Sequence, residues 1–535
     1  MKNQLLKFIS YLFILFGNDL FSQLPSELNH PSNIILKRLS AYGLLNLDYF
    51  GKNNLSAIEI DKILKNNSSD IIIRSLWDIR PPSKDTVKIP TVNKNNFRQF
   101  YKSLTLSNLK DQKNYLYQSF FDSTSIWLSI GENISFQPDQ STNEFQFIDK
   151  ITVNGIIDNK IFLSSSFSMF RHFGDHIWVS DDYKDEWTKY FPDVDITFWY
   201  TNYTSLYLKS HILDMEFSNR PFSWGWSSGN SPILSAKAVP FNRFSLYKKV
   251  GNFNFEYFHG TLLDQSINEI HLENSKIEKF IAGHRAQYIL NNNLNFSFSE
   301  LVVYGNRSPE LGYLNPISFF WAQEHNMGDL DNILLAFDFG YRVFPGIIFY
   351  NTLVLDELSW QDLFSNWWGN KYSYQLGMFI SSKNMKMPDL RIEYTATRPW
   401  TYTHTDFSYT NRGTPLGTPN GPSSISFRLE SFYLPSPKLI IQFSFENIQK
   451  GIGMGSMIHD NYDNRNKEND WETEFLLDQY YSKNMTEIKL SYYITNMIKI
   501  KGTLKANQLG NSYELIYGEI NKINKEFILG LDMKW

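Results

Sequence analysis

The sequence predicts an all-β membrane protein, a barrel of about 18 antiparallel strands preceded by a small helical region. Three observations predict this class. From residue 126 onward, apolar and polar side chains alternate in roughly eighteen segments of ~10 residues, the period and length of a tilted membrane-spanning strand. Aromatic residues make up 16% of the chain, although its mean hydropathy of −0.35 is polar. No stretch approaches the ~18 consecutive apolar residues that a membrane-spanning helix needs.

The N-terminus predicts export. Lys2 and Lys7 come first, an apolar run follows at 8–16, and Ser22 comes after it. A basic start, a short apolar run and a small residue at the cleavage point are typical of a secretory signal peptide. We therefore expect residues 1–22 to be a signal peptide that is removed. A buried N-terminal helix is the alternative interpretation.

Residues 23–120 predict a small region of two or three helices. Apolar residues such as Leu36 and Leu39 recur at helical spacing, and Ser56 stands three residues before Glu59, as in a capping box. A loosely ordered leader is the alternative interpretation of this region.

Residues 121–535 are predicted to form the barrel. The segment LNFSFSE at 294–300 alternates strictly, and the chain ends on KEFILGLDMKW, in which Phe527, Leu529, Leu531, Met533 and Trp535 share one face. A closed barrel satisfies the backbone hydrogen-bonding groups that a bilayer cannot. The terminal strand is therefore expected to close the barrel, with Trp535 in an interface girdle. A soluble β-sandwich or propeller is the alternative.

The predicted connections are short and long in turn. Short turns are expected near 291–293, 344–346 and 435–437, and short turns at one end with long loops at the other are typical of outer-membrane barrels. The long stretches fall near 171–193, 217–231, 305–331, 357–371, 398–424 and 449–484.

Composition argues against several functions. The net charge of −4 gives no basic field for nucleic acid, and a chain without cysteine has no disulfide framework and no thiolate metal site. His172 and His176 lie four residues apart, but in a strand and loop context that does not favour a metal pair. We expect no catalytic motif, no metal and no cofactor, and therefore a protein that is not an enzyme.

Three stretches carry unusual ordered motifs. They are a WG-then-LS-then-PF run in 219–247, a YLNP…DN run with a following DE in 304–357, and an RPW-Y-H…YTNRGTPLG…GP run in 393–422. In these motifs the chain resembles the outer-membrane capsule assembly proteins of the Wzi family, most of all the versions found in Bacteroidetes, among which are proteins tied to gliding motility. The resemblance covers most of the chain.

The resemblance implies an 18-stranded outer-membrane barrel with a helical region on its periplasmic side. It also implies a lectin-like, non-catalytic role in which exported capsular polysaccharide is held at the cell surface of a Gram-negative bacterium. The expected partners are this or another surface polysaccharide and outer-membrane lipid, with export or motility proteins as further candidates. A solute channel, a motility or adhesion component and an outer-membrane hydrolase are the alternative functions.

Loop residues of the right kinds support polysaccharide binding. Aromatic faces stack on sugar C–H groups, and amide, carboxylate and imidazole groups pair with hydroxyls. The candidates are Trp224, Trp226, Trp321, Asp331, Asn332, Trp367, Trp368, Trp400, Tyr402 and His404. Membership of the interface belt is the alternative for each tryptophan, and a structural brace is the alternative for Asp331 and Asn332. Arg398 is expected to pair with a lumen carboxylate such as Glu393.

Overall fold

The backbone closes on itself as a barrel. The computed structural model describes residues 37, 38, 40–43 and 47, and the range 117–534 except for 122–123, 139–142, 159, 175–188, 192–195, 228, 264–277, 292, 329, 358, 360, 363–364, 383–386, 437, 466–470, 478, 495–497 and 511–522. Eighteen of the described strands pair antiparallel with their neighbours, and the last of them pairs with the first. The predicted fold class is confirmed.

The barrel strands are β2 (Thr124–Pro138), β3 (Asn143–Ile157), β4 (Ile161–Phe173), β6 (Ile196–Leu208), β7 (Asp214–Ser218), β8 (Asn242–Val250), β9 (Phe253–Leu262), β10 (Lys279–Asn291), β11 (Leu294–Gly305), β12 (Asn332–Phe344), β13 (Ile347–Glu357), β14 (Lys371–Ile380), β15 (Asp389–Thr397), β18 (Ser424–Ser436), β19 (Leu439–Gly451), β20 (Tyr480–Tyr493), β21 (Ile498–Leu509) and β22 (Ile523–Lys534). Two short strands add to the wall: β1 (Tyr117–Phe121) pairs with β2, and β5 (Lys189–Phe191) pairs with β6. β1 begins just before the barrel boundary predicted at residue 121.

The terminal strand closes the barrel as predicted. β22 pairs with β2 from Gly131↔Lys534 to Phe136↔Leu529. Phe527 and Leu529 are exposed on the outer face, whereas Ile528 between them is buried on the inner face. The alternation therefore sorts side chains between lipid and lumen. Trp535 lies outside the described residues.

The outer face carries an apolar band around the barrel. Large apolar side chains with exposed outward faces occur on strands from β3 to β22, among them Phe145, Phe167, Phe296, Phe337, Leu376, Phe427, Leu490 and Ile500. In water such a surface would be unfavourable, but in a bilayer it matches the acyl chains. No described helix is long and apolar enough to cross a membrane.

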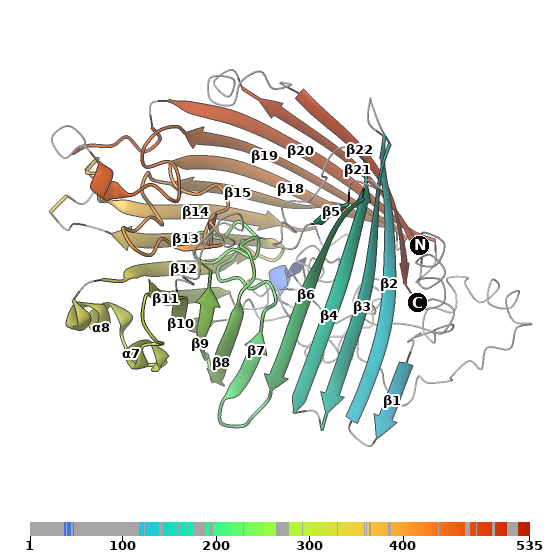
Figure 1. Ribbon diagram of the computed structural model, residues 1–535, viewed down its shortest axis with the longest axis horizontal. Coiled ribbons are helices and arrows are strands. Elements are labelled where there is room, and N and C mark those ends of the chain that lie inside the picture. Colours follow the sequence, from blue (N-terminus) through green and yellow to red (C-terminus); the bar gives the residue numbers. More distant parts are fainter. Residues whose placement is uncertain are drawn as a thin grey trace, which may run out of the picture.

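The two ends of the barrel differ as predicted. Short connections join β3 to β4, β8 to β9 and β12 to β13 at one end, where β22 also finishes. The long connections start from the opposite end, and Figure 1 shows the one between β11 and β12, with α7 (Leu311–Leu314) and α8 (Phe320–Met327), on the left. In outer-membrane barrels the short turns face the periplasm and the long loops face the outside, so we call the two ends the turn end and the loop end.

A piece of the predicted helical region contacts the turn end. Residues 37, 38, 40 and 41 are helical. Arg38 pairs with Asp389 at the start of β15 at 2.6 Å, and the guanidinium of Arg342 donates to the carbonyl oxygen of Ser40 at 2.6 Å. This part of the N-terminal region is therefore held against the turn end. The signal peptide and the rest of the predicted helical region lie outside the described residues.

The segment 219–241 between β7 and β8 turns into the lumen. Trp226 is only 1% exposed, and its indole N–H donates to Asp338 on β12 at 2.7 Å. Trp224 is also buried and donates to Glu256 on β9 at 3.0 Å. We call residues 219–241 the lumen segment, because its side chains pack inside the barrel wall.

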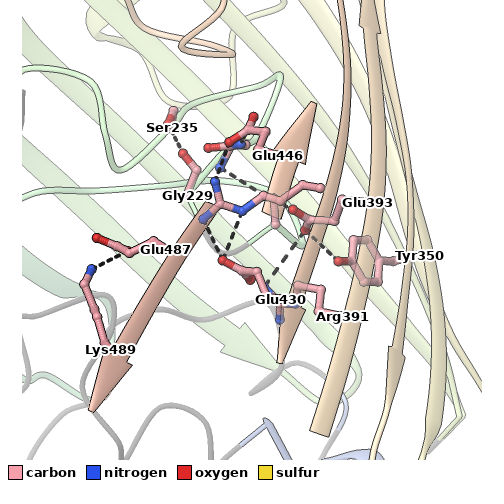
Figure 2. A network of polar contacts seen from close by, with 12 residues as sticks. Gly229, Ser235, Tyr350, Arg391, Glu393, Glu430, Glu446, Glu487 and Lys489 are labelled. Atoms are coloured by element: carbon pink, nitrogen blue, oxygen red, sulfur yellow. Dashed lines mark hydrogen bonds and ion pairs between the residues drawn. The ribbon is translucent and has the colours of Figure 1, made fainter. Parts of the chain in front are cut away.

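A charged network on the wall holds the lumen segment (Figure 2). The Arg428 guanidinium pairs with Glu430 at 2.7 Å and with Glu446 at 2.8 Å. Glu446 accepts a hydrogen bond from Asn230 at 3.2 Å, and Glu393 accepts one from Ser227 at 3.2 Å. Buried charges are stable only where such partners satisfy them, so the network specifies how the segment sits.

Two helices lie against the outside of the wall. α7 (Leu311–Leu314) and α8 (Phe320–Met327) belong to the long connection between β11 and β12, and Figure 1 shows them beside these strands at the loop end. Tyr313 and Phe320 pack on Val302 and Tyr304 of β11. The sequence predicted only a long irregular stretch here.

Candidate functional site

Three loops bring five aromatic rings together at the loop end. Trp367 and Trp368 come from the connection between β13 and β14, Trp400 from that between β15 and β18, and Tyr462 and Trp471 from that between β19 and β20. The Trp368 ring centroid lies 5.8 Å from that of Trp367, 6.2 Å from that of Trp400 and 5.7 Å from that of Tyr462. Trp471 lies 6.1 Å from Trp367. We call these five residues the mouth cluster.

Arg398 ties the loops beneath the mouth cluster. Its Nη2 donates to the carbonyl oxygens of Thr473 at 3.0 Å, Trp367 at 3.3 Å and Asn366 at 3.4 Å. The Thr473 N–H also donates to the carbonyl oxygen of Asn366 at 2.8 Å. One buried guanidinium therefore joins two loops that are far apart in sequence.

The expected pairing of Arg398 with Glu393 is wrong. Glu393 instead accepts hydrogen bonds from Tyr350 at 2.6 Å and from Ser227 at 3.2 Å. Arg398 follows the last residue of β15, so it lies at the loop end rather than beside the inward carboxylate of that strand. Its partners are backbone carbonyl oxygens of two other loops, and the sequence pattern does not reveal such contacts.

Cations flank the rings of the mouth cluster. The Arg465 guanidinium lies 3.9 Å from the Trp368 ring centroid, and the Lys371 ammonium lies 4.1 Å from that of Tyr462. Both distances are typical of cation–π contacts. Lys371 also pairs with Glu357 at 3.0 Å, and Glu357 keeps part of its carboxylate exposed. The cluster therefore offers flat rings beside charged hydrogen-bonding groups.

Strained backbone positions Trp400. Its φ of +67° lies in the left-handed region, which is costly for a bulky residue, by about 1–3 kcal/mol. The Trp400 N–H donates to the carbonyl oxygen of Gly455 at 2.8 Å. A Cβ on Gly455 would lie 2.7 Å from the Trp400 ring, so this close approach requires glycine.

His404 stabilises the same loop in its neutral form. Its Nδ1 accepts hydrogen bonds from the N–H groups of Asp406 and Phe407, both at 3.2 Å. Burial lowers the pKa of His404, and the nearby Lys371 ammonium lowers it further. A protonated ring could not accept these bonds, so geometry and pKa agree on a neutral imidazole.

The rings of the mouth cluster differ in exposure. Trp471 is 57% exposed, and Trp367, Trp368 and Tyr462 are half-buried, whereas Trp400 is buried beneath Trp368. An exposed ring beside half-buried rings gives a ligand a rigid apolar surface at little cost in side-chain ordering.

The structure separates eight of the ten predicted site residues into three places. Trp367, Trp368, Trp400 and His404 lie in or against the mouth cluster. Trp224, Trp226 and Tyr402 lie buried inside the barrel, where the Tyr402 hydroxyl donates to the carbonyl oxygen of Pro232 at 2.7 Å. Trp321 lies outside, on α8.

Asp331 and Asn332 have structural partners. The Asp331 carboxylate accepts a hydrogen bond from the Tyr313 hydroxyl at 2.7 Å and pairs with Arg307 at 2.5 Å. Asn332 donates to the carbonyl oxygen of Phe407 at 2.9 Å. Both side chains are buried, and they connect α7 to the loop that carries Trp400.

Sequence reasoning missed Tyr462, Arg465, Lys371 and Trp471. Trp471 is the one tryptophan of the stretch 449–484, which was predicted as a long loop, so composition pointed to the right segment. Tyr462 and Arg465 contact Trp368 only because two loops fold together. No local sequence pattern reveals that contact.

A catalytic-motif match occurs in the lumen segment, contrary to expectation. Residues 225–229, GWSSG, fit the G-x-S-x-G pattern of a nucleophile elbow. Ser227 is buried, however, and its hydroxyl donates to the Glu393 carboxylate rather than to a histidine. The strand, sharp turn and helix that expose such a serine are also not formed by the described residues around it. The match is a hydrogen-bonded brace.

No protein-family model matches this chain, and no curated protein matches it in sequence. Among solved structures it is similar to Wzi of Escherichia coli, described as an outer membrane protein involved in group 1 capsule assembly and as a carbohydrate-binding β-barrel. The TM-score is 0.57 at 13% identity, over 96% of this chain and 99% of that chain. Two matches from Pseudomonas aeruginosa cover 78% of this chain: the outer membrane protein OprD (TM-score 0.44, 11% identity, 94% of that chain) and OpdK (0.45, 7%, 100%).

At these identities, the likeness to Wzi shows a shared fold, that of an outer-membrane β-barrel. The resemblance drawn from the motifs is thus confirmed at the level of the fold. Fold and neighbour together support a location in the outer membrane.

Proposed function

We propose that this chain is a non-catalytic outer-membrane protein that binds surface polysaccharide at its loop end. The observation that carries the proposal is the mouth cluster, in which exposed Trp471 and half-buried Trp367 and Trp368 adjoin charged groups. Sugar C–H faces stack on such rings, and Arg465 and Glu357 are placed to pair with hydroxyl groups. The carbohydrate binding described for Wzi, which has the same fold, agrees with this function.

Within this proposal, nine of the ten candidate residues divide by exposure, and Trp321 is set apart because it lies on the outer wall. Trp367 and Trp368, with Tyr462 and Trp471, contact the glycan. Trp400, Tyr402 and His404 hold their loop in place, while Trp224, Trp226, Asp331 and Asn332 brace the interior and the loop base. Only a ring with a free face can stack on a sugar, and this decides the division.

The lumen segment favours binding over conduction. It places two tryptophans and the apolar side chains of Ile233 and Leu234 inside the barrel, all buried. A wide channel requires a clear lumen, and the Arg428 network fixes side chains across part of it. A channel therefore remains the second candidate, tested below by conductance.

The biological role that we propose for this binding is retention of exported capsular polysaccharide. A motility or adhesion component, as among the Bacteroidetes relatives suggested by the sequence motifs, is the alternative role. Deleting the gene and scoring both capsule retention and gliding separates them: loss of capsule alone supports our proposal, and loss of gliding alone contradicts it.

Binding of purified protein to polysaccharide extracted from the surface of its own cells tests the molecular proposal. We expect Trp471→Ala to weaken binding about 2- to 10-fold, because an aromatic contact contributes about 0.5–1.5 kcal/mol. Trp321→Ala is the matched control, since Trp321 is similarly exposed, at 55%, but lies on the outer wall. Equal affinity of Trp471→Ala, a Trp367→Ala/Trp471→Ala double variant and the parent chain would contradict the proposed site.

A further inference from the structure

The outward face of β11 changes character along its length. Its outward residues alternate from Phe296, which is exposed, to Glu300, Val302 and Tyr304, which are all buried. The helical hairpin of α7 and α8 accounts for the change, because it covers the wall there with Tyr313 and Phe320. A stretch of the barrel that elsewhere faces lipid is thus covered by the chain itself.

A carboxylate on this outer wall fastens the hairpin. Glu300 accepts hydrogen bonds from the N–H groups of Phe320 at 2.9 Å and Trp321 at 2.7 Å, at the start of α8. His284 on β10 lies 3.0 Å from the same carboxylate. A carboxylate without hydrogen-bond partners on the lipid face of a barrel is costly. The first N–H groups of α8 donate to the Glu300 carboxylate, and the carboxylate in turn satisfies N–H groups that have no partner within the helix.

The other side of the hairpin is apolar and uncovered. Leu311 and Ile317 are each 79% exposed, Phe319 is 70% exposed, and Trp321 is more than half exposed. From residue 311 to residue 328 the sequence carries no Asp, Lys or Arg, and the side chain of its one acidic residue, Glu324, is buried. The one histidine, His325, lies within hydrogen-bonding distance of the Trp321 carbonyl oxygen, at 2.8 Å. An exposed apolar patch of this kind is unfavourable in water and marks a surface that contacts something else.

The position of the patch identifies its occupant. It adjoins the apolar outer band, in which Phe296 on β11 and Phe337 on β12 are exposed to lipid. Because the hairpin lies at the loop end, it meets the bilayer at the outer leaflet. Tryptophan beside aliphatic side chains is typical of membrane interfaces, where the ring is half in lipid and half in water.

We propose that the α7–α8 hairpin is a membrane foot: it lies on the outer leaflet beside the barrel and buries Leu311, Ile317, Phe319 and Trp321 among lipid acyl chains. Asp331 and Asn332 join its base to the loop of Trp400, through Tyr313 and the Phe407 carbonyl group. The foot therefore braces the loop end against the membrane surface. This inference does not depend on what the mouth cluster binds.

The absence of cysteine allows a site-specific test. Single variants Ile317→Cys and Phe319→Cys carry a nitroxide label, and the full chain is reconstituted in dioleoylphosphatidylcholine vesicles. Two labelled controls bracket the result: Phe337→Cys on the lipid-facing band, and Met457→Cys, an exposed residue of a loop at the mouth. Collision of each label with oxygen, which concentrates in lipid, is compared with collision with a water-soluble nickel complex.

We expect the labels at 317 and 319 to match the label at 337, with oxygen collisions dominant. Labels that match the one at 457 would overturn the proposal, because the hairpin would then stand in water. Labels that are immobile and shielded from both reagents would also overturn it, in favour of a protein surface packed on the hairpin. Heat-modifiable migration of each variant on a gel confirms that the barrel is folded in every case.

Discussion

Arg398 offers the sharpest test of how the mouth cluster is built. Its buried guanidinium makes one well-formed hydrogen bond to Thr473 and two longer ones, to Trp367 and Asn366. A hydrogen bond to a charged group contributes about 1.5–3 kcal/mol, and the two longer bonds contribute less, so losing the fork costs about 2–3 kcal/mol of loop docking. That free energy corresponds to about 30- to 150-fold in the ratio of docked to undocked loops.

Arg398→Lys keeps the charge but cannot reach all three carbonyl oxygens from one planar group. We expect weaker polysaccharide binding, because apparent affinity falls with the fraction of protein whose loops are docked. We also expect faster proteolysis between residues 452 and 479, with an unchanged heat-modifiable barrel. Parental affinity together with parental protease resistance would refute this account of the loops.

Three further outcomes follow from the same structure. Acidification below pH 6.5 should loosen the Trp400 loop, which hydrogen exchange would measure as faster exchange of the loop amides. The pKa of His404 is lowered in the folded chain, so the undocked loop binds the proton more tightly and docking is lost as pH falls. His404→Gln should abolish this pH dependence. Gly455→Ala should weaken polysaccharide binding more than Gly453→Ala. Both glycines have positive φ, but a Cβ on Gly455 would meet the Trp400 ring, whereas nothing lies within 4 Å of a Cβ on Gly453. Equal effects of the two substitutions on binding would contradict the packing argument. Protein reconstituted in planar bilayers should show no large, stable conductance, and such a conductance would favour the channel.

The barrel could be predicted because the pattern that specifies each strand lies in consecutive residues of the sequence. Within each strand, lipid on one side and a polar lumen on the other impose a period of two that the sequence displays directly, as in Phe296, Ser297 and Phe298. Closure by the last strand followed from the same pattern. The polar residues at alternate positions also predicted that polar side chains, such as those of Arg428 and Glu446, would face the lumen.

The site was only half predictable, since loops take their direction from distant partners. Trp224 and Trp226 looked like Trp367 and Trp368, aromatic pairs among small polar residues. Asp338, far along the chain, draws Trp226 into the lumen, and no local pattern reveals that contact. In the same way, the sequence around α8 gave no sign that Glu300 would fasten the hairpin to the outer wall.

Oxidative footprinting of the tryptophans, with and without bound polysaccharide, tests the central claim most directly. Hydroxyl radicals modify exposed rings, and mass spectrometry resolves each one. At saturating polysaccharide we predict that Trp471 and Trp367 become protected, while Trp321 on the outer wall oxidises at its original rate. If bound polysaccharide leaves the oxidation of Trp471 and Trp367 unchanged, the mouth cluster is not where the glycan sits.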